Sequence, residues 1–321
     1  MSTYHEPVLA EETLAMLMTD RDGTYVDGTV GGGGHAEMIC EHLGPRGRLI
    51  GIDADADAIE ASRVRLERFG SRVTLIRGNF RHIVSELGTR GAKQLAGIVL
   101  DLGVSSHQID QAERGFSFRG GEGRLDMRMD SRRTLSAHEV INSYSQEGLE
   151  AIFREYGEER AARRIARSLI RARPVDTAGE LNAVIERCVG GRYLTKSLAR
   201  VYQAIRIEVN GELESLREAL VSVPDLLLPG GRCVVIAYHS LEDRIVKEFF
   251  REEAADRIPS HNKLVPDRPR SPRLEILTKK PVTATEQEIA RNGRARSAKL
   301  RAAERRYNGD RGEGAHGQDN G

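Results

Sequence analysis

The stretch that decides the fold is Thr24–Asp55, TYVDGTVGGGGHAEMICEHLGPRGRLIGIDAD. Its apolar start, Thr24–Val26, predicts a buried parallel strand. Four consecutive glycines at positions 31–34 follow, and they let the backbone turn tightly and approach a ligand closely. A helix over Ala36–Leu43 and a second strand over Arg48–Ile52 complete the unit. Because the free N–H groups at the start of such a helix face the loop, the pattern is typical of a nucleotide-type cofactor site.

Acidic residues at strand ends narrow the choice of cofactor. Asp53 closes the second strand about 20 residues after the glycine loop, where a carboxylate can accept both hydroxyls of an adenosyl ribose. Asp27 closes the first strand and can bind an ammonium group, and Asp101 closes a later strand, where a methyl acceptor would arrive. The pattern Gly31-x-Gly33-x-x-Ala36 also fits a dinucleotide site, but a single match is weak and does not define the chemistry. The residues therefore favour S-adenosylmethionine (AdoMet) over a nicotinamide dinucleotide.

The strand pattern continues beyond this unit and predicts a doubly wound α/β fold. Buried strands are expected over Val73–Ile76, Leu95–Leu100 and Cys233–Ala237, with an edge strand over Leu274–Thr278. Parallel strands of such a sheet present their carboxyl ends to ligands at one edge. Phe80 follows the third strand at that edge, where it can cover an adenine or pack in the core.

The α/β pattern stops between Val104 and about Asn210. Apolar residues recur there at helical spacing over Gly148–Arg173 and about Leu198–Leu216, which predicts a helical domain inserted between the fourth and fifth strands. We expect four segments: a core in two parts, residues 1–104 and 213–306, an inserted helical substrate-recognition domain, residues 105–212, and a disordered tail, residues 307–321.

Positive charge is concentrated in two places although the net charge is only +1. Residues 270–306 contain eleven Lys or Arg against four Asp or Glu, which favours a polyanionic partner, with a solvated tail as the alternative. The segment Gly148–Arg173 carries arginines on its polar face, and these either contact RNA or form a salt-bridged surface. They are Arg154, Arg160, Arg163, Arg164, Arg167 and Arg171.

Cysteine usage and the N-terminus indicate the compartment. Cys40, Cys188 and Cys233 are far apart and lack metal-ligand spacing, so we expect buried thiols, a reducing compartment and no structural metal. The N-terminus has no basic segment before an apolar run, and no stretch reaches the ~18 apolar residues of a membrane span. We expect a cytoplasmic protein with no membrane partner.

Six motifs occur in an order that resembles a known family, and the resemblance runs from about His5 to Glu304. The motifs are His5-x-Pro7-Val8-Leu9, Asp27-Gly28-Thr29 through Gly33-Gly34-His35, Asp101–Ser106, Arg114–Phe118, Leu125–Met129 and His239–Arg244. They are similar to those of the bacterial small-subunit ribosomal RNA (cytosine-N4)-methyltransferases of the H type. Ala36, Tyr238 and Gly293 depart from the family's usual serine, phenylalanine and proline.

The resemblance implies an AdoMet-dependent enzyme with a doubly wound, mostly parallel sheet of the Rossmann-like methyltransferase type and an inserted all-helical domain. It implies methylation of the exocyclic N4 amine of one cytidine in the decoding region of 16S ribosomal RNA, within the ribosomal subunit. The family's cofactor contacts fall on Gly33, Gly34, His35, Asp53, Phe80, Asp101 and Gln108.

The chemistry requires an acceptor for the amine N–H and alignment with the methyl donor, because the amine lone pair is delocalised into the cytosine ring. Asp101 is the candidate catalytic acceptor, but Leu102-Gly103-Val104 replaces the Pro-Pro-aromatic that usually follows such a residue. Asp101 can therefore hold the cofactor alone, with other side chains contacting the base; the candidates are Ser105, Ser106, His239 and Ser240.

Aromatic residues near the motifs are candidates for stacking on an extruded base. They are Phe116, Phe118 and Tyr238, with core packing an equal alternative for the two phenylalanines. Two other functions stay open: a methyltransferase acting on a small molecule or a protein, and a non-catalytic module that binds RNA or the ribosome.

Overall fold

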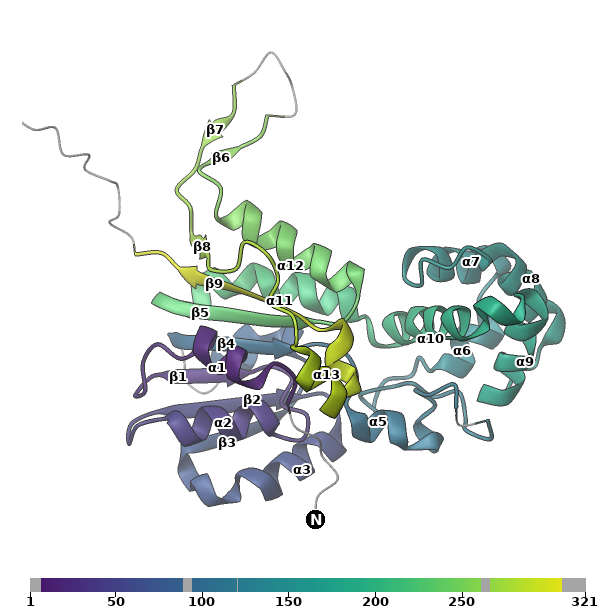
Figure 1. Cartoon of the computed structure of the whole chain (residues 1–321), viewed down its shortest axis with the longest axis horizontal. Coiled ribbons are helices and arrows are strands. Elements are labelled where there is room, and N and C mark those ends of the chain that lie inside the picture. Colours follow the sequence, from purple (N-terminus) through teal and green to yellow (C-terminus); the bar gives the residue numbers. More distant parts are fainter. Residues whose placement is uncertain (1–6, 89–93, 120, 261–265, 308–321) are drawn as a thin grey trace, which may run out of the picture.

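The computed structural model describes residues 7–88, 94–119, 121–260 and 266–307. The chain forms two lobes joined side by side (Figure 1). One lobe is a sheet with helices on both faces, and the other consists of helices α6–α10. A hairpin of β6 (Arg257–Ile258) and β7 (Arg268–Pro269) extends from the sheet lobe beyond α12.

The described residues form a seven-stranded sheet in the order β3-β2-β1-β4-β5-β9-β8. The strands β1–β5 are parallel and β9 runs antiparallel to β5 and to β8, so the predicted mostly parallel, doubly wound α/β sheet is confirmed. Their bounds are β1 Thr24–Asp27, β2 Arg48–Asp53, β3 Val73–Arg77, β4 Leu95–Asp101, β5 Leu227–Ala237, β8 Leu274–Ile276 and β9 Lys299–Arg305.

Helices cover both faces of this sheet, which explains why its central strands are continuous apolar runs. On one face, α1 (Ala10–Leu17), α2 (Gly34–His42) and α3 (Ala56–Leu66) pack in one hydrophobic cluster with residues of β1, β2, β4, β5 and β9. The other cluster joins the sheet to α4 (Ile83–Gly88), α11 (Glu212–Leu226) and α12 (Ser240–Glu253). A short helix, α13 (Glu286–Arg291), precedes β9.

The helical lobe has a hydrophobic core of its own, extending from Phe116 to Val209. The chain leaves the sheet after β4 through α5 (Ser106–Asp110) and returns at Gly211, which joins α10 to α11 in a left-handed conformation with φ 61°. The lobe's helices are α6 (Ala137–Ser143), α7 (Gln146–Glu155), α8 (Ala162–Ala172), α9 (Ala178–Cys188) and α10 (Leu194–Asn210). The predicted domain boundaries at residues 104/105 and 212/213 stay a prediction.

Two long helices predicted in this lobe are each broken. The segment Gly148–Arg173 contains α7 and α8, because the chain turns at Gly157 and Glu158, where φ of Glu158 is 49°. A Cβ at Gly157 would lie 2.7 Å from the carbonyl oxygen of Arg200, so the turn allows α7 to pack closely on α10. Similarly, the helix predicted over 198–216 ends at Asn210, and α11 begins after the turn.

The basic C-terminal segment includes a strand that the sequence analysis missed. β9 inserts between β5 and β8, with Leu300 and Ala302 buried. Its basic residues alternate with these apolar ones, and Lys299 and Arg301 form ion pairs with Asp243 at 3.4 and 2.6 Å. Two of the basic residues predicted to bind a polyanion are therefore neutralised by a carboxylate of the protein itself. The tail beyond residue 307 lies outside the described residues.

Several expectations about composition can be compared with the described residues. The cysteines Cys40, Cys188 and Cys233 are free and buried, as predicted. Within the described ranges, no group of three or more His, Cys, Asp or Glu side chains is arranged to hold a metal ion. In the same part of the chain, every helix is too short or too polar to cross a membrane.

We predict that Gly97→Ala lowers the stability of the protein by roughly 1–3 kcal/mol, because overpacked cores lose about that much. Gly97 lies in β4, and an added Cβ would lie 2.7 Å from Leu17 Cδ1 and 2.8 Å from the Tyr25 ring. Urea denaturation measures the change. Gly190→Ala is the control, because that glycine has φ −68° and no heavy atom within 4 Å of an added Cβ. An unchanged midpoint for Gly97→Ala would contradict this packing.

Candidate active site

A cleft lies at the carboxyl ends of β1, β2 and β4, where the sheet lobe meets the helical lobe. The loops after β1–β4 line its sheet side, and Met129, Asp130 and Arg133 line the side of the helical lobe. This is the edge at which doubly wound sheets bind ligands. The predicted site residues that line it are Gly34, His35, Asp53, Phe80, Asp101, Ser105 and Gln108.

The glycine loop turns directly into α2. Gly33 is the N-cap of that helix and has φ 80°, a left-handed conformation that glycine adopts without strain. Gly31 is held from both sides, since its N–H donates to Asp53 Oδ2 at 2.9 Å and its carbonyl accepts from Ser62 Oγ at 2.6 Å. The N–H groups of the first turn of α2, starting at Gly34, have no partner within the helix and are available to a ligand.

Asp53 ends β2 inside the cleft, as predicted. Its two carboxylate oxygens accept the N–H groups of Gly31 and Asp55, each at 2.9 Å, which fixes the orientation of the side chain. Burial raises the pKa of Asp53 to about 6, against the opposing effect of these N–H groups. Each oxygen retains a second lone pair that can accept a ligand hydroxyl.

Phe80 begins a short 3₁₀ turn after β3 and is half-buried. It lines the cleft and also packs against the cluster under α4, α11 and α12. The core-packing role is therefore confirmed, and a contact with an adenine stays a prediction.

Asp101 lies between two partners at the end of β4. The Tyr238 hydroxyl donates to its Oδ1 at 2.8 Å, and His35 Nε2 lies 3.6 Å from its Oδ2. His35 is 5% exposed, and neither ring nitrogen has a hydrogen-bond partner among the described residues. Burial disfavours the charged imidazole, but the Asp101 and Asp27 carboxylates outweigh it and raise the pKa of His35 above its ordinary value. A buried ring whose nitrogens make no hydrogen bond, beside a glycine loop, fits a polar ligand such as AdoMet.

Asp27 lies beneath the cleft rather than on its surface. It is 1% exposed, does not line the cleft, and accepts the N–H of Thr29 at 3.1 Å. Burial raises the pKa of Asp27 to about 7, although the neighbouring His35 opposes the shift. Asp27 is therefore buried below the residues that line the cleft, and its contact with an ammonium group stays a prediction.

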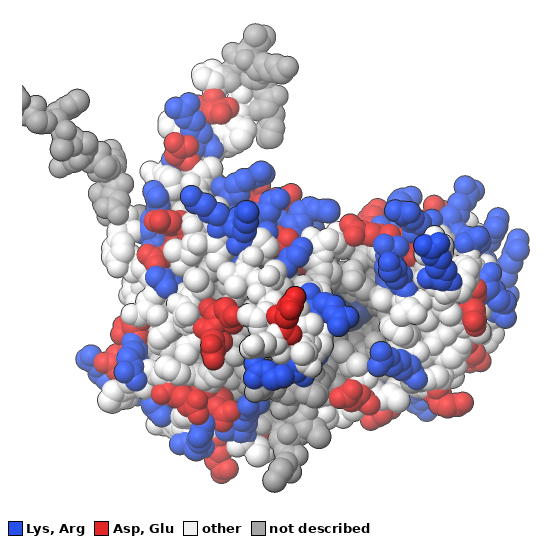
Figure 2. All heavy atoms as spheres, in the orientation of Figure 1, with Lys and Arg blue, Asp and Glu red and all other residues white. Residues whose placement is uncertain are grey.

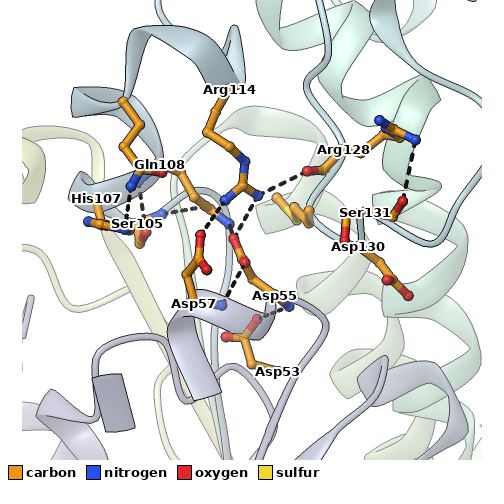
Figure 3. A network of polar contacts seen from close by, with 12 residues as sticks. Asp53, Asp55, Asp57, Ser105, His107, Gln108, Arg114, Arg128, Asp130 and Ser131 are labelled. Carbon is orange, nitrogen blue, oxygen red and sulfur yellow. Dashed lines mark hydrogen bonds and ion pairs between the residues drawn. The ribbon is translucent and has the colours of Figure 1, made fainter. Parts of the chain in front are cut away.

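A polar network joins the two lobes beside the cleft (Figure 3). Gln108 and Arg114 converge on Asp55 Oδ2, with nitrogen–oxygen distances of 2.7 and 2.8 Å, and Arg114 also donates to the carbonyl of Arg128 at 3.1 Å. Gln108 Oε1 accepts the N–H of Ser105, and Ser105 Oγ accepts the N–H of Gln108, so the two residues cap α5. Buried Gln108 thus joins α5 to Asp55, the N-cap of α3.

The predicted base-stacking phenylalanines lie elsewhere. Phe116 and Phe118 pack in the helical core, and the Phe118 ring meets Tyr202 edge-on with 5.8 Å between centroids. Neither lines the cleft, so the core-packing alternative holds for both. The physical reason is that the Arg114–Phe118 loop tucks its aromatic side chains under the helical lobe while Arg114 itself turns back to Asp55.

The other predicted substrate residues differ in position. His239 is the N-cap of α12 and contacts Glu242 at 3.1 Å, while the Ser240 hydroxyl donates to Glu158 at 3.0 Å. Neither His239 nor Ser240 lines the cleft. Tyr238 reaches the site through Asp101, although it does not line the cleft itself. Ser106 begins α5, and its side chain lies outside the described part of the structure.

Sequence reasoning missed the residues that line the far side of the cleft. Asn210 donates to the Met127 carbonyl and accepts the N–H of Met129, each at 2.8 Å, and so fixes the chain that enters the helical lobe. Glu212, two residues on, is paired with Arg206 at 2.9 Å. The Asn210-Gly211 pair within a helical pattern was the signal for a helix end, and the sequence analysis extended the helix through it.

Comparison with known proteins gives the family. The MraW methylase family matches residues 2–306. The chain is 49% identical over 308 residues, 94% of its length and 98% of the relative's, to the protein named Ribosomal RNA small subunit methyltransferase H of Pelobacter propionicus. It is 47% identical to the protein of that name from Syntrophotalea carbinolica, covering 94% of this chain and 98% of the relative. The corresponding protein of Heliobacterium modesticaldum is 45% identical, with 95% and 99% covered. With matches of this extent to one family, the chain belongs to the MraW methylase family.

Proposed function

We propose that this chain is an AdoMet-dependent methyltransferase that methylates the exocyclic N4 amine of a cytidine in the decoding region of 16S ribosomal RNA. The observation that carries the proposal is near full-length identity of 44–49% with proteins named Ribosomal RNA small subunit methyltransferase H. The cleft supports it, because a glycine loop, a helix start and carboxylates meet there at one edge of the sheet. A protein with this substrate works in the cytoplasm, where ribosomes are assembled.

The carboxylates and the glycine loop would hold the cofactor. Bound AdoMet supplies an electrophilic methyl group on a cationic sulfonium. Asp53, whose carboxylate is held by two backbone N–H groups, would accept the ribose hydroxyls, and the N–H groups at the start of α2 would donate to polar atoms of the ligand. The ring nitrogens of His35 make no hydrogen bond at the same edge, although Nε2 lies 3.6 Å from Asp101 Oδ2. Ionised Asp27 beneath the cleft would favour a cationic ligand.

Asp101 is the group best placed to accept the amine hydrogen bond. Its carboxylate lines the cleft, and Tyr238 fixes one oxygen by a hydrogen bond of 2.8 Å. An acceptor at this point aligns the amine lone pair with the methyl donor and removes its proton as the bond forms. Ser105 is engaged in capping α5, and His239 and Ser240 do not line the cleft, so Asp101 is the better candidate than these three; the side chain of Ser106 lies outside the described part of the structure.

The base must leave its stack to reach this cleft, as in other enzymes that act on bases. The opening lies between the lobes and is lined by residues from both. Arg133 and Asn210 are two of those that line it on the side of the helical lobe. The helical lobe is therefore placed to bind the RNA around the extruded nucleotide. Whether the substrate is free RNA or the assembled subunit changes the partner but not the chemistry.

A labelled-methyl transfer assay tests the function. Purified protein is incubated with labelled AdoMet and either free 16S ribosomal RNA or small subunits from a strain that lacks the enzyme. We expect label in RNA, at one cytidine, as N4-methylcytidine on digestion. Label in a protein or small molecule would support the second function considered above, and no label in any fraction would support a non-catalytic binding module.

We predict that Asp101→Asn lowers kcat by roughly 10²–10⁴, the usual contribution of a positioned acid or base, with AdoMet affinity changed only a few-fold. Tyr238→Phe removes the hydrogen bond to Asp101 and should lower kcat by about tenfold, the size expected for one hydrogen bond to a charged group. Single-turnover methyl transfer measures both. A kcat within threefold of the wild type for Asp101→Asn would contradict the assignment of Asp101 as acceptor.

We predict that Asp53→Asn weakens AdoMet binding by about 10–100-fold, because ribose hydroxyls then lose hydrogen bonds to a charged acceptor. Calorimetric titration with AdoMet measures this. The matched control is Asp57→Asn, the same chemical change at a carboxylate that contacts Arg114 at 3.2 Å and does not line the cleft. Equal loss of affinity in both variants would contradict the role given to Asp53.

A further inference from the structure

Arginines crowd the exposed side of α8 and the turn that precedes it. The buried residues Ile165, Ala166 and Leu169 face the helical core, and the arginines occupy the opposite side of the helix. Their spacing of three, four, seven and eleven residues places them on one surface. The exposed arginines, here called the α8 arginine face, are Arg160, Arg163, Arg164, Arg167 and Arg171.

Within the described part of the chain, the α8 arginine face has no acidic partners. Among the described residues, none of its members lies within 4.0 Å of a carboxylate oxygen, whereas Arg154 on α7 contacts both Glu150 and Glu155. Like charges three or four residues apart destabilise a helix. Arg163, Arg167 and Arg171 are separated by four residues each, so this surface opposes the stability of α8 rather than supporting it. The salt-bridged surface considered from the sequence is therefore wrong for this face.

An exposed aromatic side chain lies in a groove beside these arginines. Tyr193, just before α10, is 58% exposed, and the guanidinium carbon of Arg192 lies 5.7 Å from the centre of its ring. Arg160, Arg164 and Lys196 line the same groove. Glu159 also lies there, but it is buried, accepts the N–H of Ala161 at 2.8 Å, and is 3.8 Å from Arg200. The groove therefore presents cations and one flat ring to solvent.

We propose that the α8 arginine face and Tyr193 form a binding surface for an RNA strand, with phosphates on the arginines and an unpaired base stacked on the tyrosine. The proposal rests on the proposed function, because it takes the substrate to be RNA. α8 lies at the outer end of the helical lobe, away from the sheet (Figure 1), and Lys and Arg side chains gather over α7 and α8 in Figure 2. The surface thus binds RNA outside the nucleotide that enters the cleft.

The chemistry favours RNA over an acidic protein. Guanidinium groups bind phosphate with two parallel hydrogen bonds, and they are always charged. Arg163, Arg167 and Arg171 follow one line of the helix, about 12 Å long at 1.5 Å per residue, which suits successive phosphates of one strand. Exposed aromatic rings bordered by cations are the usual platform for single-stranded bases. An acidic protein segment has no base that could stack on the Tyr193 ring.

The test measures binding of a small-subunit ribosomal RNA transcript at several KCl concentrations. The triple variant Arg163→Gln, Arg167→Gln and Arg171→Gln removes three phosphate contacts. The slope of log K against log salt should then become shallower by about 2, at roughly 0.7 per single-stranded phosphate, with affinity at 0.1 M salt lowered about tenfold or more. Tyr193→Ala should lower affinity about tenfold with no change in slope, because stacking releases no counterions.

A matched control removes the same charge elsewhere. Arg46→Gln, Arg63→Gln and Arg68→Gln replace exposed arginines on the sheet lobe, each of which is ion-paired with an acid. Their combined variant should leave the slope within about 0.5 of the wild type, since none of them contacts phosphate in this account. AdoMet affinity, measured by calorimetry, should be unchanged in all variants, because none of the replaced residues touches Asp53 or His35.

The outcomes separate the two proposals. If the wild-type protein methylates the RNA but the triple variant keeps its slope and affinity, the binding surface is overturned and the proposed function stands. If the wild-type protein neither methylates nor binds the RNA, the proposed function fails, and the surface fails with it. The proposed RNA-binding surface is supported if all variants bind AdoMet normally and the salt slope becomes shallower in the α8 triple variant but not in the control variant. Equal effects of the triple variant and the control would show non-specific charge attraction and overturn it.

Discussion

The site depends on carboxylates that end three parallel strands at one edge of the sheet. Asp27, Asp53 and Asp101 close β1, β2 and β4, which are neighbours in the sheet. Burial raises the pKa of Asp27 to about 7 and that of Asp53 to about 6. Because these values lie above the unfolded value of 3.8, the free protein loses stability as the pH rises from about 4 to about 7. A bound cation would stabilise the ionised carboxylates and offset that loss of stability. The charges that destabilise the free protein therefore favour binding of the cationic AdoMet.

The rest of the structure holds this edge in place. The glycine loop is fixed by Asp53 and Ser62, and the network of Gln108 and Arg114 around Asp55 ties the helical lobe to the sheet lobe beside the cleft. Asp55 therefore links the two lobes by hydrogen bonds, although it does not line the cleft. In this account the cleft performs the chemistry, while the outer end of the helical lobe supplies affinity for the strand that carries the target base.

The sequence predicted the sheet, its edge and most of the cofactor side of the cleft, because strand ends and glycine loops are local signals. Asp53 and Asp101 could be placed from the strands that precede them. Phe116 and Phe118 could not be separated into core or surface, since an aromatic side chain in a loop is compatible with both. β9 was missed because Lys299 and Arg301 find their partner, Asp243, on α12, a contact between segments far apart in the chain. The Asn210-Gly211 pair is a recognisable signal for a helix end, but the helix was predicted to continue past it to Leu216.

Counting the protons released when the wild-type protein binds AdoMet tests most directly whether the strand-end carboxylates favour a cationic ligand. Calorimetric titration at pH 6.5 in two buffers of different ionisation enthalpy gives this number, and the ligand's own amine, with a pKa of about 7.7–8.0, is protonated throughout. A cation lowers the raised pKa values of Asp27, Asp53 and His35, so we expect net release of protons when AdoMet binds. Tight binding with no proton release, or with proton uptake, would contradict it.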